Sequence, residues 1–105
     1  MLRVYDDALD VLRELRPMLG EIARHDGDLA RQLRRCGSSM ALNIAEGSYA
    51  RGGNRKALYA VALGSTKETR ACLDVARAFG YVGEIDAVIA ERLERIGGVL
   101  YRLTP

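Results

Sequence analysis

Apolar side chains recur every three or four residues along most of the chain, and this spacing predicts α-helices rather than strands. Aspartate, asparagine and glycine interrupt the pattern at a few places and mark the expected helix ends. The expected helices span about 4–24, 29–49, 55–79 and 85–103. We expect Asp26 or Asp28 to cap the second helix and Asn54 to cap the third, which ends at Gly80.

Pro17 stands inside the first expected helix, where it removes one backbone hydrogen bond. The apolar stripe continues through it in register, which favours one kinked helix over two separate ones. The connections between the helices are short, so consecutive helices must run antiparallel. The sequence therefore predicts an all-α fold, an up-down-up-down four-helix bundle, with residues 1–105 as a single domain.

The composition, 49% apolar and 29% charged, is that of a globular domain. The first ten residues lack the apolar core of a signal peptide, and no apolar run is long enough for a membrane helix. We therefore expect a cytoplasmic protein with no membrane association. Cys36 and Cys72 fit no zinc-binding spacing, and an assumed register places them about 9 Å apart along the second and third helices. We expect two buried, reduced thiols.

Positive charge is concentrated in the middle of the chain. Segment 31–56 holds six basic residues against Glu46 alone, whereas the first thirty residues are net acidic. These six residues are candidate contacts to phosphate groups or to a protein partner: Arg31, Arg34, Arg35, Arg51, Arg55 and Lys56.

Polar residues interrupt the apolar faces of the second and third helices at matching heights. We expect them to form a structural cluster that sets the register of the two helices, made of Ser39, Asn43, Glu46, Ser65 and Glu68. No histidine accompanies the serines as a base, and His25 is expected in a loop. The sequence thus predicts a protein that is not an enzyme and holds no cofactor or metal.

The same two segments carry the pattern of a known family. The stretch "SSMALNIAEGSYAR" and the later "ALGSTKE", ending in "FGY", resemble the bundle proteins of the 23S rRNA intervening-sequence (S23) family. The matching positions are Ser39, Asn43 to Gly47, Arg51, Ala62, Gly64, Ser65, Glu68, Leu73, Ala76, Gly80 and Tyr81. The resemblance implies a small cytosolic homo-oligomer, typically a pentamer. A distant relative is similar to an accessory protein that binds a reverse transcriptase and nucleic acid.

Two functions remain open at this point. In the first, the oligomer is a nucleic-acid-binding or ribonucleoprotein accessory module, with RNA, DNA or a reverse transcriptase as its partner. In the second, it is a protein–protein scaffold with no nucleic-acid role. Its acidic stripe on the first helix, Asp7, Asp10, Glu14 and Glu21, would then meet the arginines of the second helix in a neighbouring copy.

Overall fold

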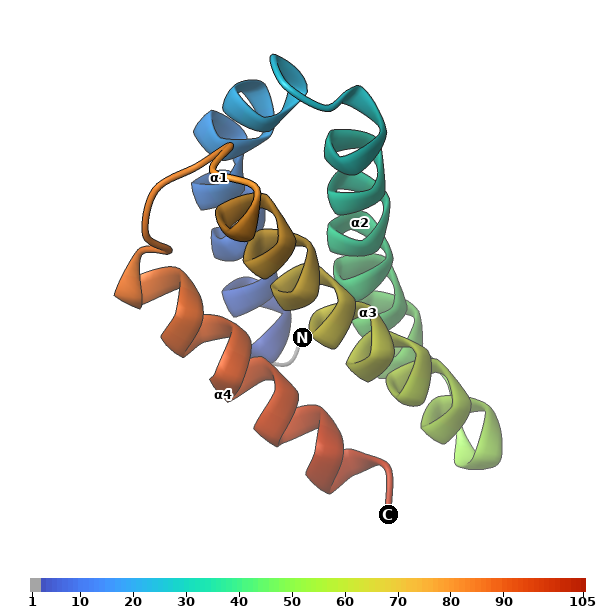
Figure 1. Cartoon of the computed structure of the whole chain (residues 1–105). Helices are drawn as coiled ribbons and strands as arrows, with labels where there is room; N and C mark the ends of the chain where they lie inside the picture. Colours follow the sequence, from blue (N-terminus) through green and yellow to red (C-terminus); the bar gives the residue numbers. More distant parts are fainter. Residues whose placement is uncertain (1–2) are drawn as a thin grey trace.

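The computed structural model describes residues 3–105 and places most of them in four α-helices (Figure 1). The helices are α1 (Arg3–Ala23), α2 (Gly27–Tyr49), α3 (Gly52–Ala78) and α4 (Ala87–Leu103). The described part of the chain contains no strand, so the all-α prediction is confirmed. Residues 1 and 2, which the predicted domain includes, lie outside the described residues.

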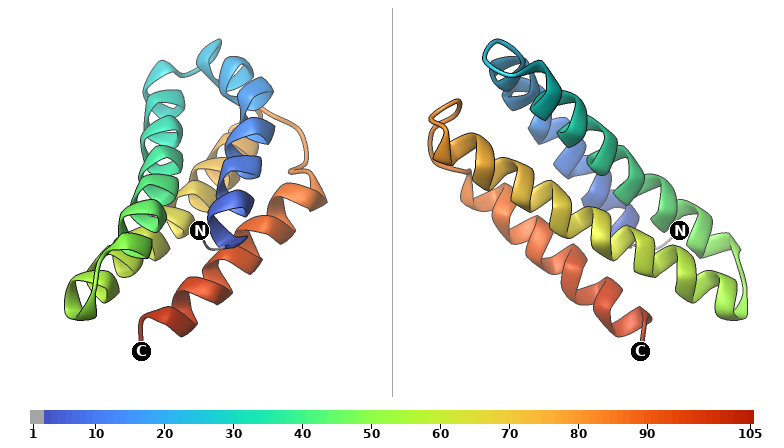
Figure 2. Two further views of the ribbon diagram at one scale, coloured as in Figure 1. Left: turned by 180° about the vertical axis from the view of Figure 1, so that it is seen from behind. Right: turned by 45° about the vertical axis from the view of Figure 1, so that its right-hand side comes forward.

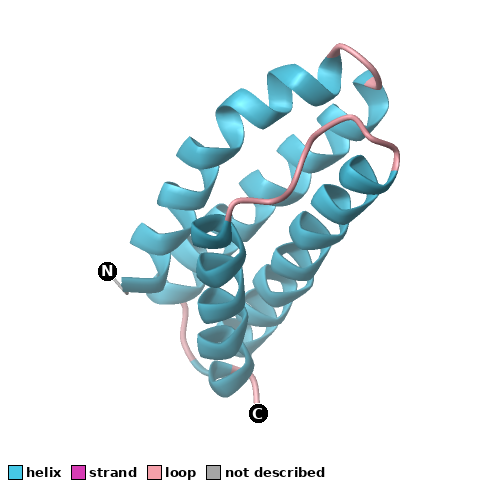
Figure 3. Cartoon of the chain, turned by 60° about the vertical axis from the view of Figure 1, so that its left-hand side comes forward, coloured by secondary structure: helices cyan, strands magenta, loops and turns pink. Residues whose placement is uncertain are grey.

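Each helix packs against its neighbours in sequence, and α4 also packs against α1 (Figures 1 and 2). The connections after α1 and α2 are only a few residues long, which reverses the chain direction at each step (Figure 3). The result is an elongated bundle with extents of 42 × 24 × 20 Å. The α2–α3 hairpin has the largest interface. Within residues 3–105, no helix has the length and apolar character needed to cross a membrane.

Of the two predicted N-caps, the one of α2 is confirmed. Asp26 caps α2 by accepting a hydrogen bond from the Leu29 N–H at 3.0 Å, and Asp86 similarly caps α4. The predicted cap at Asn54 is wrong. The α3 helix begins at Gly52, whose φ of +59° turns the chain straight into the helix after Arg51.

The apolar stripes meet in one core along the bundle axis. Pro17 lies inside a single continuous α1, whose stripe reaches the core on both sides of it. The largest fully buried side chains come from all four helices: Val11, Leu15, Ile22, Leu33, Met40, Ile44, Leu73, Ile96 and Leu100. Their burial is the main source of stability in a bundle of this kind.

Gly47 and Gly80 lie where any other residue would cause a steric clash or backbone strain. Gly47 of α2 lies directly against Tyr59 of α3, so a Cβ placed there would be only 2.5 Å from the ring's Cε1. Gly80 has a φ of +78° and ends α3. The N–H of Gly80 donates to Arg77 O, and that of Tyr81 donates to Ala76 O, both at 2.9 Å. This is the Schellman arrangement, which requires a left-handed residue.

We predict that Gly47→Ala destabilises the protein. The added methyl must displace the Tyr59 ring, and overpacking of this kind costs about 1–3 kcal/mol, which exceeds the gain in helix propensity. The control is Gly20→Ala, since nothing lies within 4 Å of a Cβ at that position in α1. Urea unfolding should give a lower midpoint for the first variant and an equal or higher one for the second. Equal midpoints for Gly47→Ala and the parent chain would contradict the tight contact.

We also predict that Gly80→Ala lowers the free energy of unfolding by about 1–2 kcal/mol, because the new side chain must adopt a left-handed backbone conformation. A Cβ at Gly80 meets nothing within 4 Å, so the loss isolates backbone strain. Gly83→Ala is the matched control in the same loop: its site is equally open and its φ is not positive. Thermal unfolding of the two variants should separate them, and an unchanged melting temperature for Gly80→Ala would refute the assignment.

Candidate functional site

The serines and the asparagine of the predicted polar cluster come together between α2 and α3. The hydroxyl of Ser65 donates to Ser39 Oγ at 2.8 Å. Asn43 Nδ2 donates to Ser39 Oγ at 3.1 Å and to Ser39 O at 2.9 Å. This chain of bonds joins the two helices near mid-height and satisfies groups that would be costly to leave unpaired.

The two carboxylates of the cluster lie elsewhere. Glu68 accepts a hydrogen bond of 3.4 Å from Gln32 Nε2, at the exposed edge of the same interface. Glu46 is exposed and is hydrogen-bonded to none of the other four cluster residues, so its inclusion in the cluster was wrong. On α2 it stands three residues beyond Asn43, a rotation of about −60° that carries it away from the apolar stripe of Met40 and Ile44.

A pocket of about 430 Å³ opens to solvent beside these residues. It is lined by Gln32, Arg35, Cys36, Ser39, Ser65 and Glu68, all from α2 and α3. The family-like motifs therefore meet at an open polar groove rather than only inside the hairpin. Hydroxyl, amide and charged groups there can bind a polar group. The histidine that could activate a serine lies in the α1–α2 turn instead.

The two cysteines are buried free thiols, which confirms the expected reduced state. Thr69 donates its hydroxyl to Cys36 Sγ at 3.4 Å. Burial, followed by the neighbouring Cys36 thiol, raises the pKa of Cys72 to about 12, so it stays protonated at neutral pH. The predicted separation of the thiols was wrong. The assumed register placed Cys36 opposite residue 66, whereas the helices bring it against Thr69.

The six candidate basic residues do not form one patch. Arg31 pairs with Asp28 on its own helix. Arg34 and Arg35 lie in the N-terminal half of α2, and Arg51 lies beyond its C-terminus. The last fourteen residues of α2, about 21 Å of helix, lie between Arg35 and Arg51. The basic segment therefore serves two distant regions of the hairpin.

Arg55 also has a structural role, which the sequence did not predict, at the end of α2. Its Nε donates to Gly47 O at 3.1 Å and to Ala50 O at 2.9 Å, and its Nη2 donates to Ser48 O at 3.2 Å. The negative end of the α2 dipole also stabilises the positive charge of Arg55 at these carbonyls. Among the other five candidates, Arg34, Arg35, Arg51 and Lys56 are exposed and have no ion-pair partner within residues 3–105.

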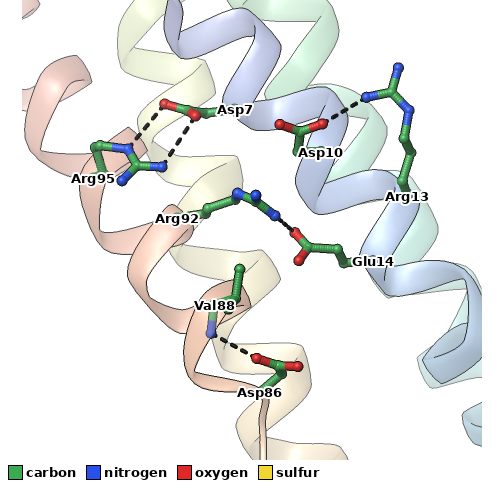
Figure 4. A network of polar contacts seen from close by, with 8 residues as sticks. All are labelled: Asp7, Asp10, Arg13, Glu14, Asp86, Val88, Arg92 and Arg95. Carbon is green, nitrogen blue, oxygen red and sulfur yellow. Dashed lines mark hydrogen bonds and ion pairs between the residues drawn. The ribbon is translucent and has the colours of Figure 1, made fainter.

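Most of the acidic stripe on α1 is paired within the chain (Figure 4). Asp7 accepts two hydrogen bonds of 3.2 Å from Arg95, and Glu14 pairs with Arg92, both on α4. Asp10 pairs with Arg13 on α1 at 2.9 Å. The hydrogen bond from Arg92 to Glu14 also raises the pKa of Arg92, which remains charged. The scaffold hypothesis needed these acids to meet the α2 arginines of another copy, and the α4 arginines already hold two of them.

Among the residues described, no group of three or more histidine, cysteine or acidic side chains is arranged to hold a metal ion. Sequence reasoning missed one feature of the surface. His25, Phe79 and Tyr81 bring their rings together at one end of the bundle. The "FGY" motif was the available signal, but the partner His25 lies more than fifty residues away in the sequence.

Comparison with known proteins places this arrangement in a family. No curated protein matches the sequence. A solved structure with the same fold is that of a protein of unknown function from the S23 ribosomal protein family of Bacteroides thetaiotaomicron VPI-5482. Its TM-score is 0.82 at 19% identity, over 96% of this chain and 97% of the other. Residues 1–102 match the profile described as 23S rRNA-intervening sequence protein. The chain therefore belongs to the 23S rRNA-intervening sequence protein family.

Proposed function

We propose that this protein is a non-enzymatic, cytoplasmic homo-oligomer that binds nucleic acid as an accessory module. The observation that carries the proposal is the set of exposed basic side chains on the α2–α3 hairpin. The α4 arginines hold two acids of α1, while Arg34, Arg35, Arg51 and Lys56 have no ion-pair partner in the described chain. Unpaired arginines at a surface are suited to phosphate contact.

The family name refers to 23S rRNA, which supports a nucleic-acid context. A charged surface alone would also suit an acidic protein partner. A nucleic-acid partner also accounts for the division of the basic side chains between two distant regions of the elongated α2–α3 hairpin. A nucleic acid strand carries phosphates along its whole length and can contact two separated basic regions at once. A compact acidic site on a protein would instead need the basic side chains close together.

Exposed apolar side chains support self-association. Among residues 3–105, four of the seven large ones belong to α2 and α3. Val61 and Val75 of α3 are separated by two heptads and so share one side of the helix, at 52% and 41% exposure. Leu42 of α2 is 60% exposed. A second copy of the chain that covers this side would remove these groups from water.

We predict salt-dependent binding of single-stranded RNA. Affinity should fall steeply between about 50 and about 200 mM salt as phosphate contacts are lost. The double variant Arg34→Ala/Arg35→Ala should reduce the log–log slope by about 1.4, since each single-strand contact contributes about 0.7. Arg13→Ala, which removes an exposed arginine paired on α1, should leave the slope unchanged. Fluorescence anisotropy measures both. No binding by the parent chain at about 50 mM salt would refute the function.

We predict an oligomer held together chiefly by apolar contacts. Native mass spectrometry should give a multiple of the 11.5 kDa chain, and a pentamer would have about 58 kDa. Val61→Glu should shift the mass to that of the monomer without loss of helical circular dichroism, because Val61 is exposed in the single chain. Lys67→Glu is the control for charge on α3. A parent chain that is monomeric throughout would contradict the proposed assembly.

A further inference from the structure

The α1–α2 and α3–α4 connections lie at the same end of the bundle (Figure 3). Three aromatic rings are stacked at this end. The His25 and Tyr81 rings have centroids 5.2 Å apart and planes within 6° of parallel. The Phe79 and Tyr81 rings are 5.3 Å apart and within 15°. Near-parallel rings at this spacing are in the offset-stacked arrangement that aromatic pairs favour. We call His25, Phe79 and Tyr81 the aromatic stack.

The backbone holds this stack in place from both sides. Gly80 reverses the chain between Phe79 and Tyr81, and its left-handed conformation comes with the two Schellman bonds described above. The other side is fixed by the end of α1, where the N–H of His25 donates to Ile22 O at 2.9 Å. The rings are therefore set in position before any ligand arrives.

Phe79 leaves most of its ring in solvent, at 67% exposure. An apolar ring so exposed at the edge of a stack offers a face on which another planar group can continue it. Basic residues lie close in the sequence to His25 and to Phe79, the two outer members of the stack. Arg24 directly precedes His25 and has no ion-pair partner in residues 3–105. Arg77 lies two residues before Phe79 and makes one exposed ion pair, 3.3 Å from Glu84.

Planar rings beside positive charge are the features by which proteins hold single-stranded nucleic acid. Each base offers a π-face to an aromatic ring, and each phosphate offers a charge to an arginine. We propose that a base of a single-stranded nucleic acid stacks on Phe79, with Arg24 and Arg77 contacting the adjacent phosphates. The proposal rests on the nucleic-acid function proposed above and assigns it a place in the fold. A second copy of the chain would bury the ring but would not need the flanking arginines.

The test uses a single-stranded oligonucleotide carrying the fluorescent base 2-aminopurine, in RNA and DNA forms. Binding to the parent chain should quench the base, as stacking does. Phe79→Ala should remove the quench and weaken binding about 5- to 150-fold, the range for loss of one stacked base. Phe79→Tyr should retain both. Tyr49→Ala, which removes another exposed ring at the opposite end of α2, should bind as the parent chain does.

The other outcomes separate the two claims. Parent-like binding and quench by Phe79→Ala would overturn the stacking site while the nucleic-acid function stands. Loss of binding in Tyr49→Ala but not in Phe79→Ala would also overturn it. No binding by the parent chain would refute the proposed function and this inference together. A fall in the native mass of Phe79→Ala would show that another copy occupies the ring, against the proposal. Circular dichroism checks that each variant is folded.

Discussion

The close approach of α2 and α3 is the contact on which the rest of the structure depends. Gly47 allows it, because any larger residue would push the Tyr59 ring and with it the whole hairpin apart. At this distance the hydroxyls of Ser39 and Ser65 can bond directly across the interface. Once the register is set, every other residue of the hairpin has a fixed place, including those that line the open pocket.

The outer helices close the bundle by a different means. Burial of their apolar stripes supplies the stability. Burial alone would allow several alignments of α1 against α4, and the ion pairs between the two helices favour one of them. Asp7 is largely buried, and the two nearly equal bonds from Arg95 give its carboxylate a single orientation. This pairing also decides the charge of the surface. It holds two α1 acids beside α4, so they do not neutralise Arg34 and Arg35 of α2.

The helices and most of their ends could be predicted from the sequence, because apolar spacing and capping residues act locally. Asn54 shows where local reasoning fails: its side chain suits a cap, but Gly52 had already turned the chain into the helix. Arg55 shows a second limit, since its guanidinium folds back on carbonyls that are exposed only once α2 has ended. The predicted separation of the two thiols failed for a third reason. A register error of a few residues changes which side chains face each other.

The aromatic stack joins residues that come together only in the folded bundle. This affects the free energy of binding a ligand at this end of the bundle. A flexible loop with exposed rings would lose conformational entropy on binding, which offsets much of the stacking energy. Here the cap of α3 and the end of α1 have already ordered the rings, and that ordering is part of the folding free energy. A ligand that stacks on Phe79 therefore meets a surface that needs no further arrangement. The same argument explains why a glycine is required at position 80: it sets the direction of Tyr81 against both of its neighbours in the stack.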